Sequence, residues 1–323
     1  MQRTVFAVIQ PIDDESNAKW LPPAFQIAGW ATAATWSVIS VAALATYKPH
    51  RIMHNSIGVV QSLTALPLII ACFTALKDAA SSGSLQLAAC RRLNLGLATA
   101  SIWSAFAVVF ASALTSAVVR TADPVRYSLP ISFGATAVHI AVAGLCIRTW
   151  SRSVDAPSIG RVVSGALGSL WTMAPGQQSV ASIYYATLAA CSVAFTALAA
   201  FAPFPLATVP SLLGKRLARA HGAWTLLLAV ALFNLKCHAD GKTEGLDLEA
   251  AENALAATLR YGVRRVAVLH LAVAVARPLL DVASHYPAAL SCKPATAASL
   301  LVYLLAWHAT TRSTNVDAEA SAQ

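Results

Sequence analysis

The chain is a succession of long apolar runs separated by short polar connections. Most of these runs approach the roughly 20 helical residues that cross a hydrocarbon layer of about 30 Å. Their apolar positions are nearly continuous, as expected for helices surrounded by apolar contacts on every side. The pattern predicts an all-α membrane protein, a polytopic bundle of about eight transmembrane helices. The eight runs lie at about residues 24–46, 57–76, 93–119, 129–147, 183–201, 222–235, 263–280 and 295–307.

These runs divide the chain into five segments. The first four helices are predicted within residues 24–150 and the last four within 180–310, and a polar segment, 1–23, precedes them. The longest connection, 151–179, is rich in glycine and too short in its apolar part for a span, which favours a linker with a helix lying in the interface. Residues 311–323 have the composition of a disordered tail.

The two sets of four helices show local similarity, which suggests a 4+4 internal duplication. Residues 31–38 can be aligned with 186–193, and Leu93–Gly96 with Leu259–Gly262. Four helices return the chain to its starting side, so the repeat would be parallel, with a pseudo-twofold axis along the membrane normal. Alanine-rich helices also match by chance, and the sequence alone leaves both explanations open.

Composition supports the membrane assignment. Hydrophobic residues make up 57% of the chain and charged residues 11%, whereas about a quarter of a soluble protein is charged. The formal charge of +9 comes from Lys and Arg that gather at the ends of apolar runs, where they meet anionic lipid headgroups. This placement favours the bilayer, and not nucleic acid, as the partner.

Topology and targeting follow from the same charges. Lys and Arg are more numerous on the side that carries the two termini, which mildly favours both termini inside. The N-terminal segment shows no cleavable signal, and its acidic cluster of Asp13, Asp14 and Glu15 argues against a transit peptide. The sequence leaves the compartment open.

The most polar and breakable run is the second. Gln61, Ser62 and Thr64 precede Pro67, which lies in the middle of that run and predicts a kink. Together with Asn234 in the sixth run, these residues form a candidate solute pathway. No carboxylate lies at the centre of a run, which argues against ion-coupled transport and leaves a neutral or anionic solute.

Two histidines, His139 and His270, fall within apolar runs. Imidazoles from two helices can ligate a haem, and they can equally form hydrogen bonds between helices. His50 and His54 have the HxxxH spacing, which resembles one histidine box of membrane-bound desaturases. The other histidines stand alone, so this pair is only a weak candidate for a metal site.

No motif for nucleotide binding or serine hydrolysis occurs in a suitable context. The leading hypothesis is therefore a transporter-like, multi-pass membrane protein that binds or passes a small solute between two helical halves. The alternatives are a haem-binding membrane redox protein, which is the enzymatic option, and a non-catalytic membrane scaffold.

Overall fold

A computed structural model describes most of the chain. The described residues are 15–45, 63–118, 129–152, 160–161, 164–165, 180–201, 212–240, 249–283, 301 and 303–311. All of the following observations concern these residues, among which no strand occurs. The helices are α1 (Glu15–Ala45), α3 (Leu66–Ser81), α4 (Ala88–Val118), α5 (Leu129–Ser151), α7 (Val180–Phe201), α8 (Leu212–Ala239) and α9 (Glu249–Ala283), and residues 303–311 are also helical.

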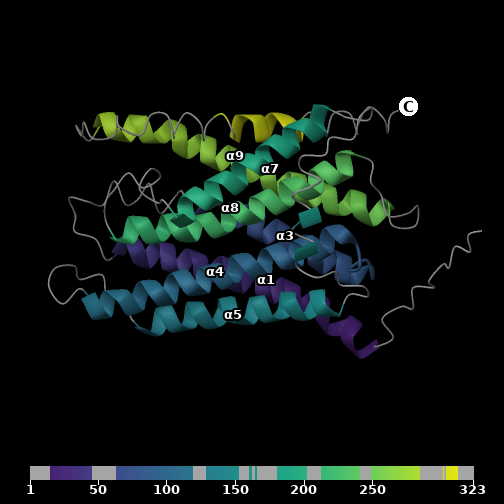
Figure 1. The fold of residues 1–323 in the computed structure, drawn as a ribbon, viewed down its shortest axis with the longest axis horizontal. Helices are drawn as coiled ribbons and strands as arrows, with labels where there is room; N and C mark the ends of the chain where they lie inside the picture. The colour runs from purple at the N-terminus through teal and green to yellow at the C-terminus, as the bar shows by residue number, and fades with distance from the viewer. Residues whose placement is uncertain are drawn as a thin grey trace, which may run out of the picture.

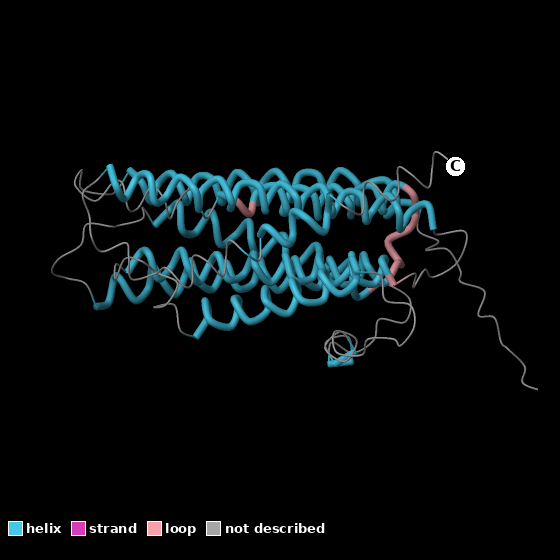
Figure 2. The backbone as a smooth tube through the Cα atoms, turned by 90° about the horizontal axis from the view of Figure 1, so that it is seen from above, coloured by secondary structure: helices cyan, strands magenta, loops and turns pink. Residues whose placement is uncertain are grey.

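The helices run along the long axis of an elongated bundle (Figure 1) and form two layers when seen from above (Figure 2). The main packing pairs are α1 with α3, α4 with α5, and α7 with α8. Two further pairs, α3 with α9 and α4 with α8, connect the first part of the chain to the second. Helix α8 lies at the centre, because 72% of its apolar segment Gly222–Ala239 is buried by other helices.

The all-helical prediction is confirmed, with several differences at the boundaries. Helices cover the first seven apolar runs as far as these are described, and the eighth run is helical at 303–307. Pro67 does not kink a helix in mid-run: α3 begins at Leu66, so the proline lies in the first turn, where its missing N–H is not needed. The sixth apolar run, 222–235, covers only part of its helix, because α8 starts at Leu212 with a basic turn that precedes the apolar part.

Three of the described helices are long and apolar enough to cross a membrane. These segments are Phe133–Ser151 in α5, Val180–Ala197 in α7 and Gly222–Ala239 in α8. The segments in α5 and α7 are only 28% and 39% buried within the bundle. Much of their apolar surface therefore faces outward.

Neighbouring helices run in opposite directions. The Arg148 guanidinium at the end of α5 lies 5.2 Å from the ring of Trp20 near the start of α1. The Ser182 hydroxyl in the first turn of α7 donates to Asp240, which follows α8. The starts of α1 and α7 and the ends of α5 and α8 thus lie at one end of the bundle, at the right of Figure 1. We refer to it as the Trp20 end.

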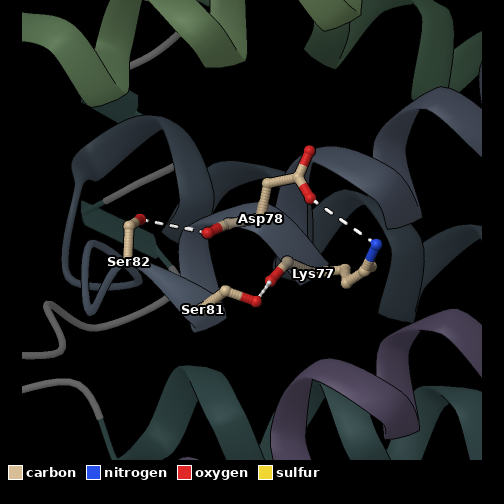
Figure 3. Close-up of polar contacts among 4 residues, drawn as sticks. All are labelled: Lys77, Asp78, Ser81 and Ser82. Carbon is tan, nitrogen blue, oxygen red and sulfur yellow. Dashed lines mark hydrogen bonds and ion pairs between the residues drawn. The ribbon is translucent and has the colours of Figure 1, made fainter.

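Helix α3 ends at the Trp20 end (Figure 1) in a polar turn, which Figure 3 shows in close-up. The Ser81 hydroxyl donates to the carbonyl of Lys77, and the Ser82 hydroxyl donates to the carbonyl of Asp78, each at 3.0 Å. Lys77 and Asp78 form an exposed ion pair at 3.9 Å, which contributes little to stability. Gly83 has a φ of 70°, which lets the chain turn back towards α4.

Two glycines permit the crossings that link the first part of the chain to the second. A Cβ atom on Gly262 of α9 would lie 2.5 Å from the Cβ of Ala71 in α3. On Gly96 of α4 it would lie 3.1 Å from the side chain of Val230 in α8. Small residues at such crossings allow close backbone approach, which is a main source of helix association in lipid.

We predict that Gly262→Ala destabilises the bundle by about 1–3 kcal/mol, because the added methyl group overpacks the contact between α3 and α9. The second substitution Ala71→Gly should restore most of the loss by removing the opposing methyl group. Thermal unfolding in detergent measures both effects. Gly144→Ala is the control, since nothing lies within 4 Å of an added Cβ there. An equal loss in Gly144→Ala would contradict the steric explanation.

Candidate functional site

Asn234 joins α8 to the start of α4. Its side-chain oxygen accepts a hydrogen bond of 2.6 Å from Nε of Arg92, and its amide donates to the Ala89 carbonyl at 3.3 Å. The Arg92 guanidinium also lies 5.4 Å from the centre of the Phe233 ring. Since both polar groups of the amide are engaged with α4, this candidate pathway residue acts in the structure as a connection between two helices.

A buried ion pair lies on the opposite side of α8, near the Trp20 end. Lys236 Nζ is 2.7 Å from Asp240 Oδ2, and the lysine side chain is only 4% exposed. Asp240 also accepts the hydrogen bond from Ser182 of α7. Pairing with two donors offsets the cost of burying the carboxylate. This group fixes α7 against the end of α8.

His270 of α9 packs against α3 and the C-terminal helical residues. Its Nδ1 lies 3.2 Å from the Val266 carbonyl, which can only accept, so Nδ1 carries a proton. In the neutral ring Nε2 then accepts from the Thr64 hydroxyl, at 3.2 Å. The imidazole stacks on the Tyr303 ring, with centroids 3.9 Å apart. An iron atom at Nε2 would have to displace the threonine, so these contacts match the hydrogen-bonding interpretation of His270.

His139 of α5 has a different environment. It is fully buried, and neither of its ring nitrogens has a hydrogen-bond partner among the described residues. Its ring centroid lies 6.3 Å from that of Trp224 in α8, which in turn lies 5.8 Å from that of Trp36 in α1. The indole N–H of Trp224 is also buried and, within the described part of the chain, has no partner.

Helix α4 contributes further polar groups of this kind. The hydroxyls of Ser101 and Ser104 and the side-chain oxygen of Asn94 are buried, and the described residues offer them no partner. These three positions are spaced by seven and three residues, so they share one face of the helix. Thr99, on the same helix, donates instead to the Leu95 carbonyl one turn back. The two serine hydroxyls lack even this local bond.

The register of α4 against α8 follows from two contacts. Arg92 is bonded to Asn234, and Gly96 faces Val230. Four residues forward along α4 therefore correspond to four residues back along α8, as in an antiparallel pair. Six residues further in each direction, Trp224 lies level with position 102 of α4.

This register places the unpaired groups of α4 and α8 at one level of the bundle. Trp224 lies level with the turn of α4 that carries Ser101 and Ser104, and His139 of α5 lies beside the same indole. We refer to Ser101, Ser104, His139 and Trp224 as the inner cluster. Unsatisfied buried polar groups cost about 1–3 kcal/mol each, so several at one level indicate that something other than the described side chains satisfies them.

The outcome for the sequence-predicted residues is mixed. Thr64 and His270 form one pair, Asn234 is bonded elsewhere, and Pro67 only opens α3. Gln61, Ser62, His50 and His54 lie outside the described residues. Sequence reasoning named His139 but missed its neighbours in the inner cluster. The available signal was the spacing of Asn94, Ser101 and Ser104 along one face of the third run.

No group of three or more His, Cys, Asp or Glu side chains that could hold a metal occurs in the described part of the chain. Comparisons with protein-family models, with curated proteins and with solved structures found no match.

We predict that Thr64→Val destabilises the protein by about 0.5–1.5 kcal/mol, because it removes the hydrogen bond to His270. In a His270→Phe background, which keeps an aromatic ring beside Tyr303, the same substitution should cost clearly less. Chemical denaturation in detergent gives the coupling between the two sites. The exposed Thr99→Val serves as the control, and equal costs in both backgrounds would rule out the predicted interaction.

Proposed function

We propose that the protein is a multi-pass membrane protein built from two related helical halves, and that it binds or passes a small solute between its helices. The observation that carries the membrane assignment is the apolar face that the bundle presents outward. The solute-binding part of the proposal is supported by the inner cluster of buried, unpaired polar groups.

The outward faces are continuous apolar stripes with helical spacing. On α1 the exposed positions include Ile27, Trp30, Val38 and Val41, and no charged residue occurs from 21 to 45. On α5 the exposed residues Phe133, Ile140 and Ile147 recur every seven residues. A soluble bundle would carry charged side chains at such positions. Lipid is the environment that these surfaces fit.

The helix pairs support a duplication. Suppose that α1 corresponds to α7, α3 to α8, and α4 to α9. The packed pair α1–α3 then corresponds to the packed pair α7–α8, and the packed pair α4–α8 corresponds to α9–α3. The fourth members would be α5 and the C-terminal helical residues. Tyr303 of the C-terminal helical residues contacts α9, and α5 likewise contacts α4. The ring centroid of His308 lies 6.1 Å from that of Tyr184 in α7, and α5 likewise packs on α1.

The glycine contacts support the same exchange. Gly96 and Gly262 are the residues aligned between the halves from sequence, and each lies where the third helix of its half meets the second helix of the other half. Matched helices also run in the same direction, which supports a parallel repeat with its axis along the bundle.

The basic residues at the Trp20 end support binding to anionic headgroups and an inside orientation of this end. They include Lys19, Arg91, Arg92, Arg148 and Arg152.

Ile140→Lys tests the membrane assignment, because Ile140 is 60% exposed at the middle of α5. A lysine at the centre of a membrane helix costs about 2.5–3.5 kcal/mol on the insertion scale, so we predict a marked loss of membrane-inserted protein. Ile140→Phe should insert normally. In water the lysine would be harmless, so undiminished yield of a soluble Ile140→Lys protein would contradict the proposal.

Cysteine labelling tests the multi-pass topology. In a cysteine-free background, Ser82→Cys reports the Trp20 end and Asp123→Cys reports the connection between α4 and α5. A membrane-impermeant maleimide added to intact cells should label Asp123→Cys and leave Ser82→Cys unlabelled until the membrane is opened. Labelling of both positions from the outside would show that α4 does not cross the membrane.

A further inference from the structure

We infer that the inner cluster binds a small uncharged solute through a hydrogen-bond acceptor of that solute, and that the pair Thr64–His270 with Tyr303 is its self-occupied counterpart in the other half. The first part rests on the buried polar groups themselves. The comparison of the two sites rests on the proposed duplication.

The two sites occupy equivalent places. Ser104 follows Gly96 by eight residues, and His270 follows Gly262 by eight residues. Val230 of α8 and Ala71 of α3 are the side chains that face the two glycines. Trp224 precedes Val230 by six residues in α8, and Thr64, in the turn before α3, precedes Ala71 by seven. Each site therefore combines the third helix of one half with the second helix of the other, or with the turn that leads into that helix.

The fourth helix of each half completes its site with an aromatic ring. Tyr303 stacks on His270 in one site, and His139 lies beside Trp224 in the other. In both places helices from the two halves meet around a histidine. The resemblance between the sites lies in position and in residue class, since the individual side chains differ.

The two sites differ in how their polar groups are satisfied. In the site of α9, the His270 imidazole forms hydrogen bonds with Thr64 and with the Val266 carbonyl. Side chain and backbone of the protein thus satisfy both ring nitrogens. In the inner cluster the hydroxyls of Ser101 and Ser104, both nitrogens of His139 and the indole N–H of Trp224 have no partner in the described part of the chain. Of the two sites compared, the inner cluster is therefore the one whose donors are free to bind a guest molecule.

The chemistry of the cluster defines the guest. Two hydroxyls, one imidazole and one indole offer four N–H or O–H donors, and the indole can only donate. A guest with a carbonyl or similar oxygen meets this set. Helices α4, α5 and α8 carry no Asp, Glu, Lys or Arg within 93–118, 129–147 and 220–235, so nothing there neutralises an ion, and burying one would be costly.

The size of the guest is also restricted. All four side chains of the inner cluster are at most 1% exposed, and the rings of His139 and Trp224 are 6.3 Å apart. The large Trp224 stands opposite the small Ser104, whereas the small Thr64 stands opposite the large His270. Close burial of all four side chains restricts the proposed guest to few non-hydrogen atoms, as in formamide or urea.

Binding is tested with the full-length protein in detergent, labelled with ¹⁵N at its tryptophan indoles. The Trp224 signal is assigned by its loss in Trp224→Phe. We expect formamide to shift this signal saturably, and we expect formate and methylammonium not to. The signal of the lipid-facing Trp30, which is 61% exposed, should stay unchanged. A wild-type protein without saturable binding of formamide would show that water alone fills the cluster and would overturn the inference, as would a preference for either ion.

Variants connect binding to the named residues. The double substitution Ser101→Ala with Ser104→Ala should weaken formamide binding about tenfold, since it removes two hydrogen-bonding groups. Thr99→Val on the same helix should bind as the wild type does. Equal affinity in the serine variant would overturn the assignment of the site. If that variant fails to fold, the titration of the wild-type protein still tests whether formamide binds.

Flux separates this inference from the proposed function. In proteoliposomes, formamide entry is followed by light scattering for the wild type and for the serine variant. Binding of formamide without flux would support the binding site and refute the passage of solute through the protein. If the serine variant carries the same formamide flux as the wild type, the protein passes solute but the inner cluster is not on the route.

Discussion

The structure depends on the need to satisfy buried polar groups where water is absent. Within an apolar bundle a donor or acceptor must find a partner in the protein or in a bound molecule. Most hydroxyls of the described helices meet this need locally; Thr32 and Ser192, for example, each donate to a carbonyl one turn back at 2.8 Å. The remaining polar side chains define where helices are joined and where they are not.

Polar bridges and close apolar contacts have separate tasks along α8. At the Trp20 end, Arg92 with Asn234, and Lys236 with Asp240, attach this helix to α4 and strengthen its contact with α7. Further along, the contact of Gly96 with Val230 brings the backbones of α4 and α8 together. Beyond that contact Thr225 still joins α8 to Thr196 of α7 through a hydroxyl pair 2.9 Å apart, whereas the indole N–H of Trp224 has no partner in the described part of the chain. The central helix is thus polar and well joined at one end, and incompletely satisfied in its interior.

The sequence predicted the helices well, because apolar continuity is a strong local signal. It placed Pro67 wrongly in mid-helix, since the start of α3 depends on the chain before it and not on apolar content. It identified His139 and His270 as residues that need partners. It could not predict which partners they have, because Thr64 and Trp224 are brought to them by helix pairs that are distant in sequence. Small residues such as Ser101 and Ser104 do not indicate a site by themselves, because they are common in packed helices. Their relation to Trp224 follows only from the register of α4 against α8.

The exchange of helix contacts has a consequence for synthesis of the chain. Helix α3 is covered by α9, and α4 is covered by α8, so α3 and α4 each leave the ribosome with a contact face still open. Leu68, whose backbone lies against Gly262 of α9 and whose side chain is 1% exposed in the finished bundle, must wait for a partner made more than a hundred residues later. The early helices therefore have to remain close together, in lipid or beside an insertion factor, until the second half of the chain arrives.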